Sequence, residues 1–102
     1  VFNSARGNTG IFVFTYEGTE WGLELCHLKQ LPSLGIRKQG EDIASTGNTG
    51  SATTGAHLHV TIHKDAMVTK NYTLLISEAA FIKLWVEGKI VDPFLWFSQR
   101  FT

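Results

Sequence analysis

The sequence predicts a single, mainly β domain with one helix late in the chain. Short runs rich in β-branched and aromatic residues, and stretches in which apolar and polar residues alternate, dominate the first two thirds. Helical spacing of apolar residues appears only after them. The length of 102 residues suits one hydrophobic core, and a composition of 43% apolar and 18% charged residues excludes a disordered chain.

The first predicted elements form a hairpin. Residues 11–16 (IFVFTY) lie between two glycines and are typical of a strand. Residues 21–28 (WGLELCHL) alternate, which places the odd-numbered side chains, the last of them His27, on one face. The short connection 17–20 joins the two strands. Residues 1–3 are expected to be the tail of a strand already under way.

Two further strands are predicted around a loop. Residues 41–46 (EDIAST) are expected to form a short strand, and residues 47–55 (GNTGSATTG) a loop of small side chains. Residues 57–63 (HLHVTIH) have the clearest alternation in the chain and predict a strand.

The C-terminal third changes character. Residues 77–87 have a serine start signal, helical spacing of apolar side chains and a glycine just beyond, so they predict a helix. Asp92, which precedes a proline, is interpreted as a turn residue. The apolar segment 94–97 (FLWF) is expected to pack back on the sheet.

Charge and cysteine content exclude several classes of protein. Nine basic and nine acidic residues give a net charge of zero, which argues against nucleic-acid and anionic-membrane partners. Apolar runs of four residues or fewer argue against membrane insertion. A single cysteine provides no disulfide framework. Alternation places Cys26 on the strand face opposite His27, so Cys26 is predicted to be a small buried hydrophobe and not a nucleophile.

The histidines are the candidate functional residues. His57 and His59 leave the same face of their predicted strand, roughly 6.6 Å apart at the backbone, and Thr61 and His63 continue that face. This row is compatible with a metal or catalytic site, and also with the solvated face of an edge strand. His27 is interpreted as a core or rim histidine unless its strand lies beside the row.

Residues 47–59 (GNTGSATTGAHLH) resemble the G-x-T-G … T-G-P-H-L-H-F-E stretch of the lysostaphin/LytM-type zinc endopeptidases. Three other blocks occur in the order that the family has. Residues 25–28 (LCHL) resemble its Y-x-H-L strand, residues 36–44 its V-x-x-G-Q-x-I-G turn, and residues 87–93 (EGKIVDP) its closing N-G-K-P-V-D-P.

The resemblance implies an antiparallel β-sheet groove that holds one zinc ion and hydrolyses peptide bonds of bacterial cell-wall peptidoglycan. Carried over residue by residue, it makes His59 a zinc ligand. It makes His27 and His57 the catalytic residues that assist the attacking water and the charge on the scissile carbonyl. The implied partner is a peptidoglycan peptide. The implied location is outside the cytoplasm: secreted, periplasmic, at the cell wall or on a phage virion.

The sequence departs from the family in its zinc ligands. The family's H-x-x-x-D motif has no counterpart, since no histidine precedes His27 and no aspartate precedes Asp42. Residues 1–102 are therefore expected to be the C-terminal part of the catalytic domain, with an incomplete ligand set that an upstream segment completes. Residues 66–86 are expected to be an insertion, and other virion or wall proteins are possible partners. The alternatives are a metal-free, degenerate member that binds the wall or is structural, and a separate metal site on the His57, His59 and His63 row.

Overall fold

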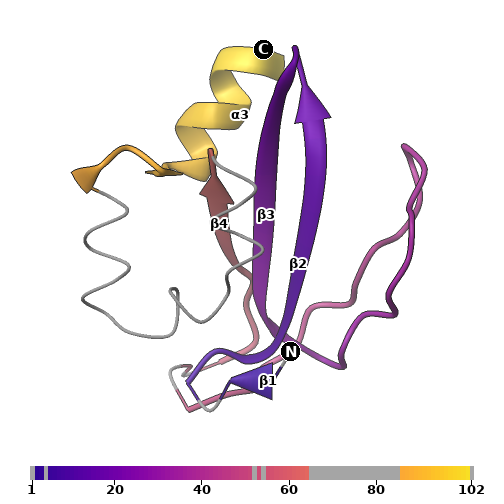
Figure 1. The fold of residues 1–102 in the computed structure, drawn as a ribbon. Coiled ribbons are helices and arrows are strands. Elements are labelled where there is room, and N and C mark those ends of the chain that lie inside the picture. The colour runs from indigo at the N-terminus through magenta and orange to yellow at the C-terminus, as the bar shows by residue number, and fades with distance from the viewer. Residues whose placement is uncertain (1, 4, 52, 54, 65–85, 102) are drawn as a thin grey trace. The chain divides into compact units, whose positions relative to one another are not determined.

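The computed structural model describes residues 2–3, 5–51, 53, 55–64 and 86–101. In this part of the chain the prediction of a mainly β fold is confirmed: a five-stranded sheet has the order β1-β2-β3-β4-β5. Figure 1 shows these strands and the C-terminal helix α3 (Pro93–Phe101). The strands are β1 (Phe2–Asn3), β2 (Gly7–Tyr16), β3 (Thr19–Leu28), β4 (His59–His63) and β5 (Ile90–Val91).

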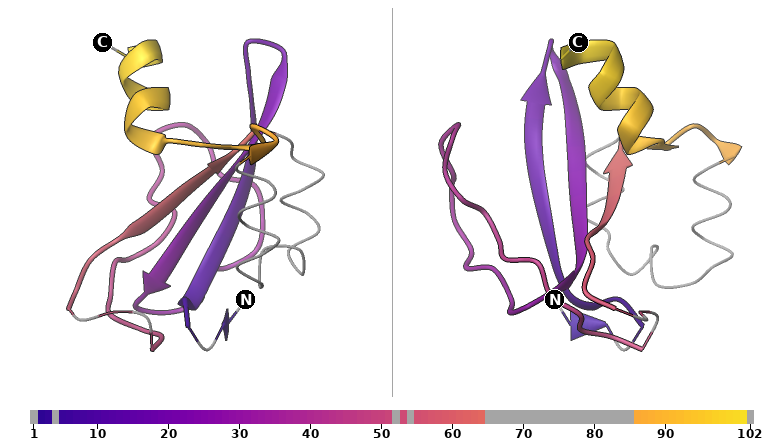
Figure 2. Two further views of the ribbon diagram at one scale, coloured as in Figure 1. Left: turned by 90° about the vertical axis from the view of Figure 1, so that its left-hand side faces the viewer. Right: turned by 180° about the vertical axis from the view of Figure 1, so that it is seen from behind.

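The predicted hairpin is the longest regular feature of the described structure. β2 and β3 lie side by side in Figures 1 and 2, and a tight turn at Glu17 and Gly18 joins them. Both turn residues have positive φ, 50° and 77°. Two left-handed residues in a row twist the chain in the same sense as the flanking strands. The connection is therefore shorter than the four residues predicted, and β3 begins at Thr19.

The chain divides into two compact units. The first unit contains Val1–Gly10 and Leu25–His59, and the second contains Ile11–Glu24 and Val60–Thr102. Three of the four histidines, His27, His57 and His59, belong to the first unit, and His63 belongs to the second. The candidate site is therefore built within one unit.

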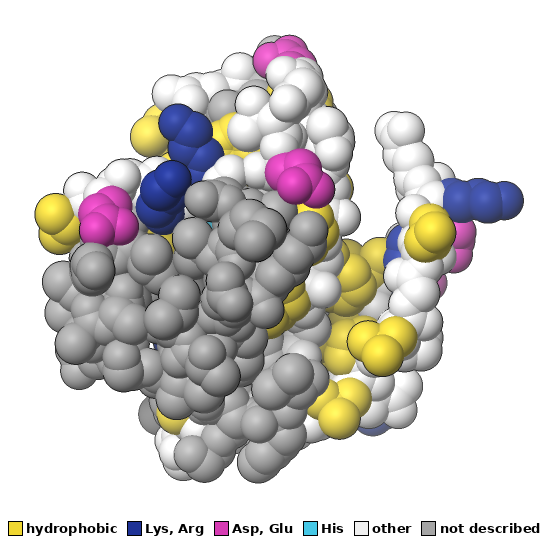
Figure 3. All heavy atoms as spheres, in the orientation of Figure 1, with side chains coloured by type: hydrophobic (Ala, Val, Ile, Leu, Met, Phe, Trp, Pro, Cys, Tyr) yellow, Lys and Arg dark blue, Asp and Glu magenta, His cyan; other side chains and the backbone are white. Residues whose placement is uncertain are grey.

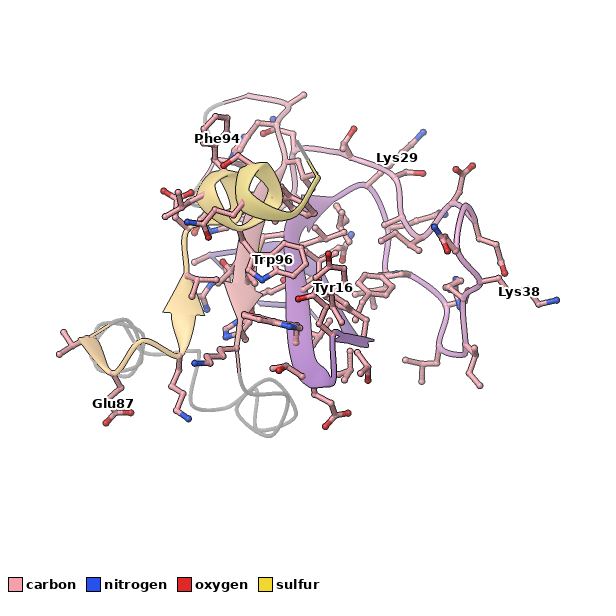
Figure 4. All side chains as sticks on the ribbon, turned by 90° about the horizontal axis from the view of Figure 1, so that it is seen from above. Tyr16, Lys29, Lys38, Glu87, Phe94 and Trp96 are labelled. Carbon is pink, nitrogen blue, oxygen red and sulfur yellow. The ribbon has the colours of Figure 1, made fainter. Side chains whose placement is uncertain are left out.

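The second unit packs around Trp96 of α3. Trp21, Ile62 and Trp96 form its buried cluster. The Trp96 ring makes edge contacts with Tyr16 and Trp21, at centroid distances of 5.7 and 5.3 Å. Figure 4 shows Trp96 directed toward Tyr16. In the apolar segment 94–97, Trp96 is the residue that packs into this cluster. The segment is part of helix α3.

Helix α3 begins where a turn was predicted. The Leu95 backbone N–H donates to the Asp92 side chain at 3.2 Å, and the Trp96 N–H donates to the Asp92 carbonyl at 2.9 Å. Asp92 is therefore the N-cap, and Pro93 takes the first helical position, where no N–H is needed. The helix predicted over residues 77–87 falls almost wholly on residues 65–85, which lie outside the described part of the chain.

The prediction of a strand over residues 41–46 is wrong. Only Thr46 is bridged there, to Leu28. Glu41 forms a local turn instead: its side chain accepts the Lys38 N–H at 2.7 Å, and its own N–H donates to the Lys38 carbonyl at 3.1 Å. Side-chain bonds of this kind compete with strand pairing.

The segment that connects β3 to the loop of residues 47–55 is an arm, which we define as residues 29–46. The Lys29 N–H donates to the Ser45 carbonyl at 3.0 Å and closes its base. Leu34 and Ile36 are 100% and 95% exposed on it. Figure 3 shows hydrophobic side chains at the surface of this segment. Within the described residues, no helix combines the length and apolar character needed to cross a bilayer.

Candidate functional site

The structure brings three of the predicted site residues together. His27 lies near the end of β3, and His59 begins β4. His57 precedes β4 and forms an isolated bridge with Gly47, so the predicted strand begins two residues later than expected. The His27 ring lies 4.7 Å from the His57 ring and 6.1 Å from the His59 ring, measured between centroids. The strand that carries His27 therefore lies beside the strand that begins at His59.

The backbone of His27 departs from regular strand geometry. Its φ is 61°, which lies in the left-handed region and is uncommon for a residue with a side chain. The His27 N–H donates to the Arg6 carbonyl at 2.7 Å. A left-handed residue interrupts the alternation of a strand and redirects a side chain, as in a bulge. The assignment of His27 to the face of Leu25 therefore does not follow from sequence position alone.

Backbone carbonyl groups determine which ring nitrogen carries the proton in two of the histidines. His27 Nδ1 lies 2.7 Å from the Thr49 carbonyl oxygen, and His57 Nδ1 lies 2.7 Å from the Gly55 carbonyl oxygen. A carbonyl only accepts, so each Nδ1 carries the proton. In the neutral rings, the lone pair is consequently on Nε2 of both histidines.

Accessibility differs among the three histidines. His27 is buried, with 3% of its surface exposed, whereas the side chains of His57 and His59 remain exposed. Partial burial, then the charges of His27, Arg6 and His57, lower the pKa of His59 below its ordinary value of 6.5. A lowered pKa favours the neutral form of His59, which has a lone pair to offer to a metal ion.

The lowered pKa of His59 predicts how stability depends on pH. Between the ordinary value of 6.5 and the lower folded-state value, the unfolded chain binds a proton that the folded protein does not. This contribution to stability is fully present above pH 6.5 and is lost as the pH falls through that window. In denaturant titrations of metal-free protein, we expect a smaller loss on acidification for His59→Asn than for the wild type. Equal losses would contradict the assignment.

The small residues of the predicted loop pack against the chain's own backbone. A Cβ at Gly50 would overlap the Ala5 carbonyl oxygen, and one at Gly47 would lie 2.6 Å from the Lys29 nitrogen. Gly7 is equally tight, since its Cβ would overlap the Thr49 backbone. The absence of a side chain at these glycines therefore permits close packing of the loop against the chain's own backbone.

Sequence reasoning missed Thr49, Arg6 and Asn8, all of which contact or support His27. Thr49 lies between Gly47 and Gly50 in a tight loop, and a threonine in such a position is a usable signal for side-chain bonding to backbone. Arg6 and Asn8 carry no local signal, because they reach the site only through tertiary pairing.

The histidines have the donor chemistry for zinc but do not complete a site among themselves. Neutral imidazole is a normal zinc ligand, and a catalytic zinc needs three protein ligands. No group of three or more His, Cys, Asp or Glu residues among those described is placed to hold a metal ion. His63 is buried in the second unit, so a site on the His57, His59 and His63 row gains no support. Cys26 is fully buried, as predicted.

No protein family, curated protein or solved structure matches this chain. The resemblance of residues 47–59 to zinc endopeptidases therefore stays a prediction. What supports a function is the arrangement of the three histidines in the first unit.

Proposed function

We propose that this chain is part of a zinc-dependent endopeptidase that hydrolyses peptide bonds of bacterial cell-wall peptidoglycan. One observation carries the proposal: the rings of His27, His57 and His59 gather in one unit, and two of them are fixed with the lone pair on Nε2. These are the three histidines that the sequence motifs single out. The proposed location follows the substrate: outside the cytoplasm, at the wall or on a virion.

His59 is the proposed zinc ligand of this chain. Its lowered pKa favours the neutral ring, which a metal ligand requires. The two further protein ligands come, in this proposal, from outside the described residues. Zinc bound there would polarise the scissile carbonyl and bring the pKa of its water to about 7.

His57 and His27 are the proposed acid–base residues. His57 is exposed, and its Nε2 can take a proton from the attacking water and return it to the leaving amine. His27 is buried beside it and, with its proton on Nδ1, can accept a hydrogen bond at Nε2 from the attacking water and so help to orient it. The Nδ1 bonds to backbone carbonyls leave Nε2 as the working nitrogen in both rings.

Metal removal tests this function. We expect the protein at its natural length to contain zinc near a ratio of about one per chain. A chelator should abolish release of peptides from purified peptidoglycan, and added zinc should restore it. The matched control is chelator already saturated with zinc, which should leave hydrolysis intact.

Two outcomes would overturn the proposal. Wall hydrolysis that survives complete zinc removal would exclude a zinc mechanism. Wall binding without hydrolysis, in a protein that takes up no zinc, would favour the alternative of a metal-free wall-binding module.

A further inference from the structure

Thr49 contacts three parts of the first unit at once. Its carbonyl oxygen accepts the Nδ1–H of His27 at 2.7 Å. Its hydroxyl oxygen accepts the backbone N–H of Asn8, on β2, at 3.0 Å. The same hydroxyl donates to the Leu28 carbonyl, one residue beyond His27, at 2.7 Å. Both the donor and an acceptor position of the hydroxyl are therefore used.

These contacts fix the Thr49 carbonyl relative to the His27 ring. The hydroxyl holds Thr49 to the backbone of β2 and to the end of β3, the strand that carries His27. Asn8 reinforces this arrangement, since its side-chain amide donates to the Leu28 and Lys29 carbonyls at 3.3 Å. The carbonyl that meets the imidazole is thus tied by side-chain bonds to the strand ends beside it.

We propose that Thr49 is the positioning residue of His27, and that its hydroxyl holds the carbonyl that selects the Nδ1–H tautomer. In the other tautomer, a ring lone pair would face the carbonyl oxygen, which is repulsive. His27 is a buried residue, with 3% of its surface exposed, so water does not readily replace the lost bond. The catalytic consequence rests on the proposed function, whereas the tautomer itself does not.

Nitrogen-15 NMR of the imidazole rings tests the tautomer in the metal-free protein, at a pH high enough that the spectrum shows the ring to be neutral. In the wild type we expect His27 to be protonated at Nδ1, with a slowly exchanging proton. A wild-type His27 protonated at Nε2 would overturn the proposal without any variant.

Substitutions separate the hydroxyl from the shape of the side chain. Thr49→Val keeps the shape and removes both hydroxyl bonds, and should give mixed tautomers with faster proton exchange. Thr49→Ser keeps the hydroxyl and should restore the Nδ1–H tautomer. Thr46→Val, at an exposed neighbouring position, is the matched control and should leave the His27 signals unchanged. A Thr49→Val protein that folds and retains the single Nδ1–H tautomer would refute the role of the hydroxyl.

Activity provides a second readout. We expect kcat of Thr49→Val to fall by on the order of tenfold, as is typical when a bond that orients a site histidine through its partner is lost, with zinc content and KM little changed. An unchanged kcat together with mixed tautomers would overturn the catalytic consequence. If the tautomers change as expected but even the wild type hydrolyses no wall peptide, the positioning role stands and the proposed function fails.

Discussion

Replacing His59 with alanine is expected to remove zinc from the protein and reduce hydrolysis of peptidoglycan below detection. His59 is the proposed ligand, and its loss leaves the metal with fewer than the three protein ligands that a catalytic zinc needs. Elemental mass spectrometry of the purified protein would measure zinc per chain. Release of peptides from purified walls would measure activity.

His57→Ala is the matched comparison for the His59 variant. It removes an exposed imidazole from the same cluster, and the proposed acid–base role predicts that zinc stays while hydrolysis falls by about 10²–10⁴-fold. Thermal unfolding would establish that both variants fold. Retention of zinc by His59→Ala, or equal loss of zinc from both variants, would contradict the assigned roles.

Gly50→Ala is expected to lower the free energy of unfolding by about 3 kcal/mol. Two effects add at this position. Gly50 has a φ of +90°, which side-chain-bearing residues rarely adopt, and its Cβ would overlap the Ala5 carbonyl oxygen and the Gly7 nitrogen. These atoms belong to backbone, so relief requires movement of the loop that holds Thr49. Chemical denaturation would measure the change.

Gly40 is the matched control for this substitution. Its φ is +89°, and nothing lies within 4 Å of where its Cβ would be. Gly40→Ala therefore measures the effect of the positive φ alone and is expected to lower the free energy of unfolding by about 1 kcal/mol. Equal losses at Gly40 and Gly50 would mean that the close approach of the loop to residues 5–7 contributes no energy.

The regular strands could be predicted because their signals are local. Alternation over residues 21–28 places β3, and the aromatic run at 11–16 lies within β2. Local signals gave a wrong prediction of a strand at residues 41–46, where the Glu41 side chain closes a turn with Lys38. They also missed α3, because an aspartate before a proline is compatible with both a turn and a helix N-cap.

The sequence could name the three candidate histidines but could not predict that they lie together. The spacing of His57 and His59 identified them as candidates, and His27 was recognised through a resemblance. Their gathering depends on a positive φ at His27 and on a bond from its ring to Thr49, 22 residues away. Neither is encoded by periodicity, because both arise from the pairing of distant segments.

The closed base of the arm separates sequence changes within residues 30–44 from changes at the junction itself. The Leu28–Thr46 bridge and the Lys29–Ser45 hydrogen bond join the ends of the arm through backbone groups. Because this junction is made by backbone groups, it does not require particular side chains in the segment that it closes. Its free energy also changes only slowly with the length of that segment. We therefore expect residues 30–44 to tolerate a change of length or sequence, with the neighbouring histidines kept in place. Library design on this scaffold would begin there.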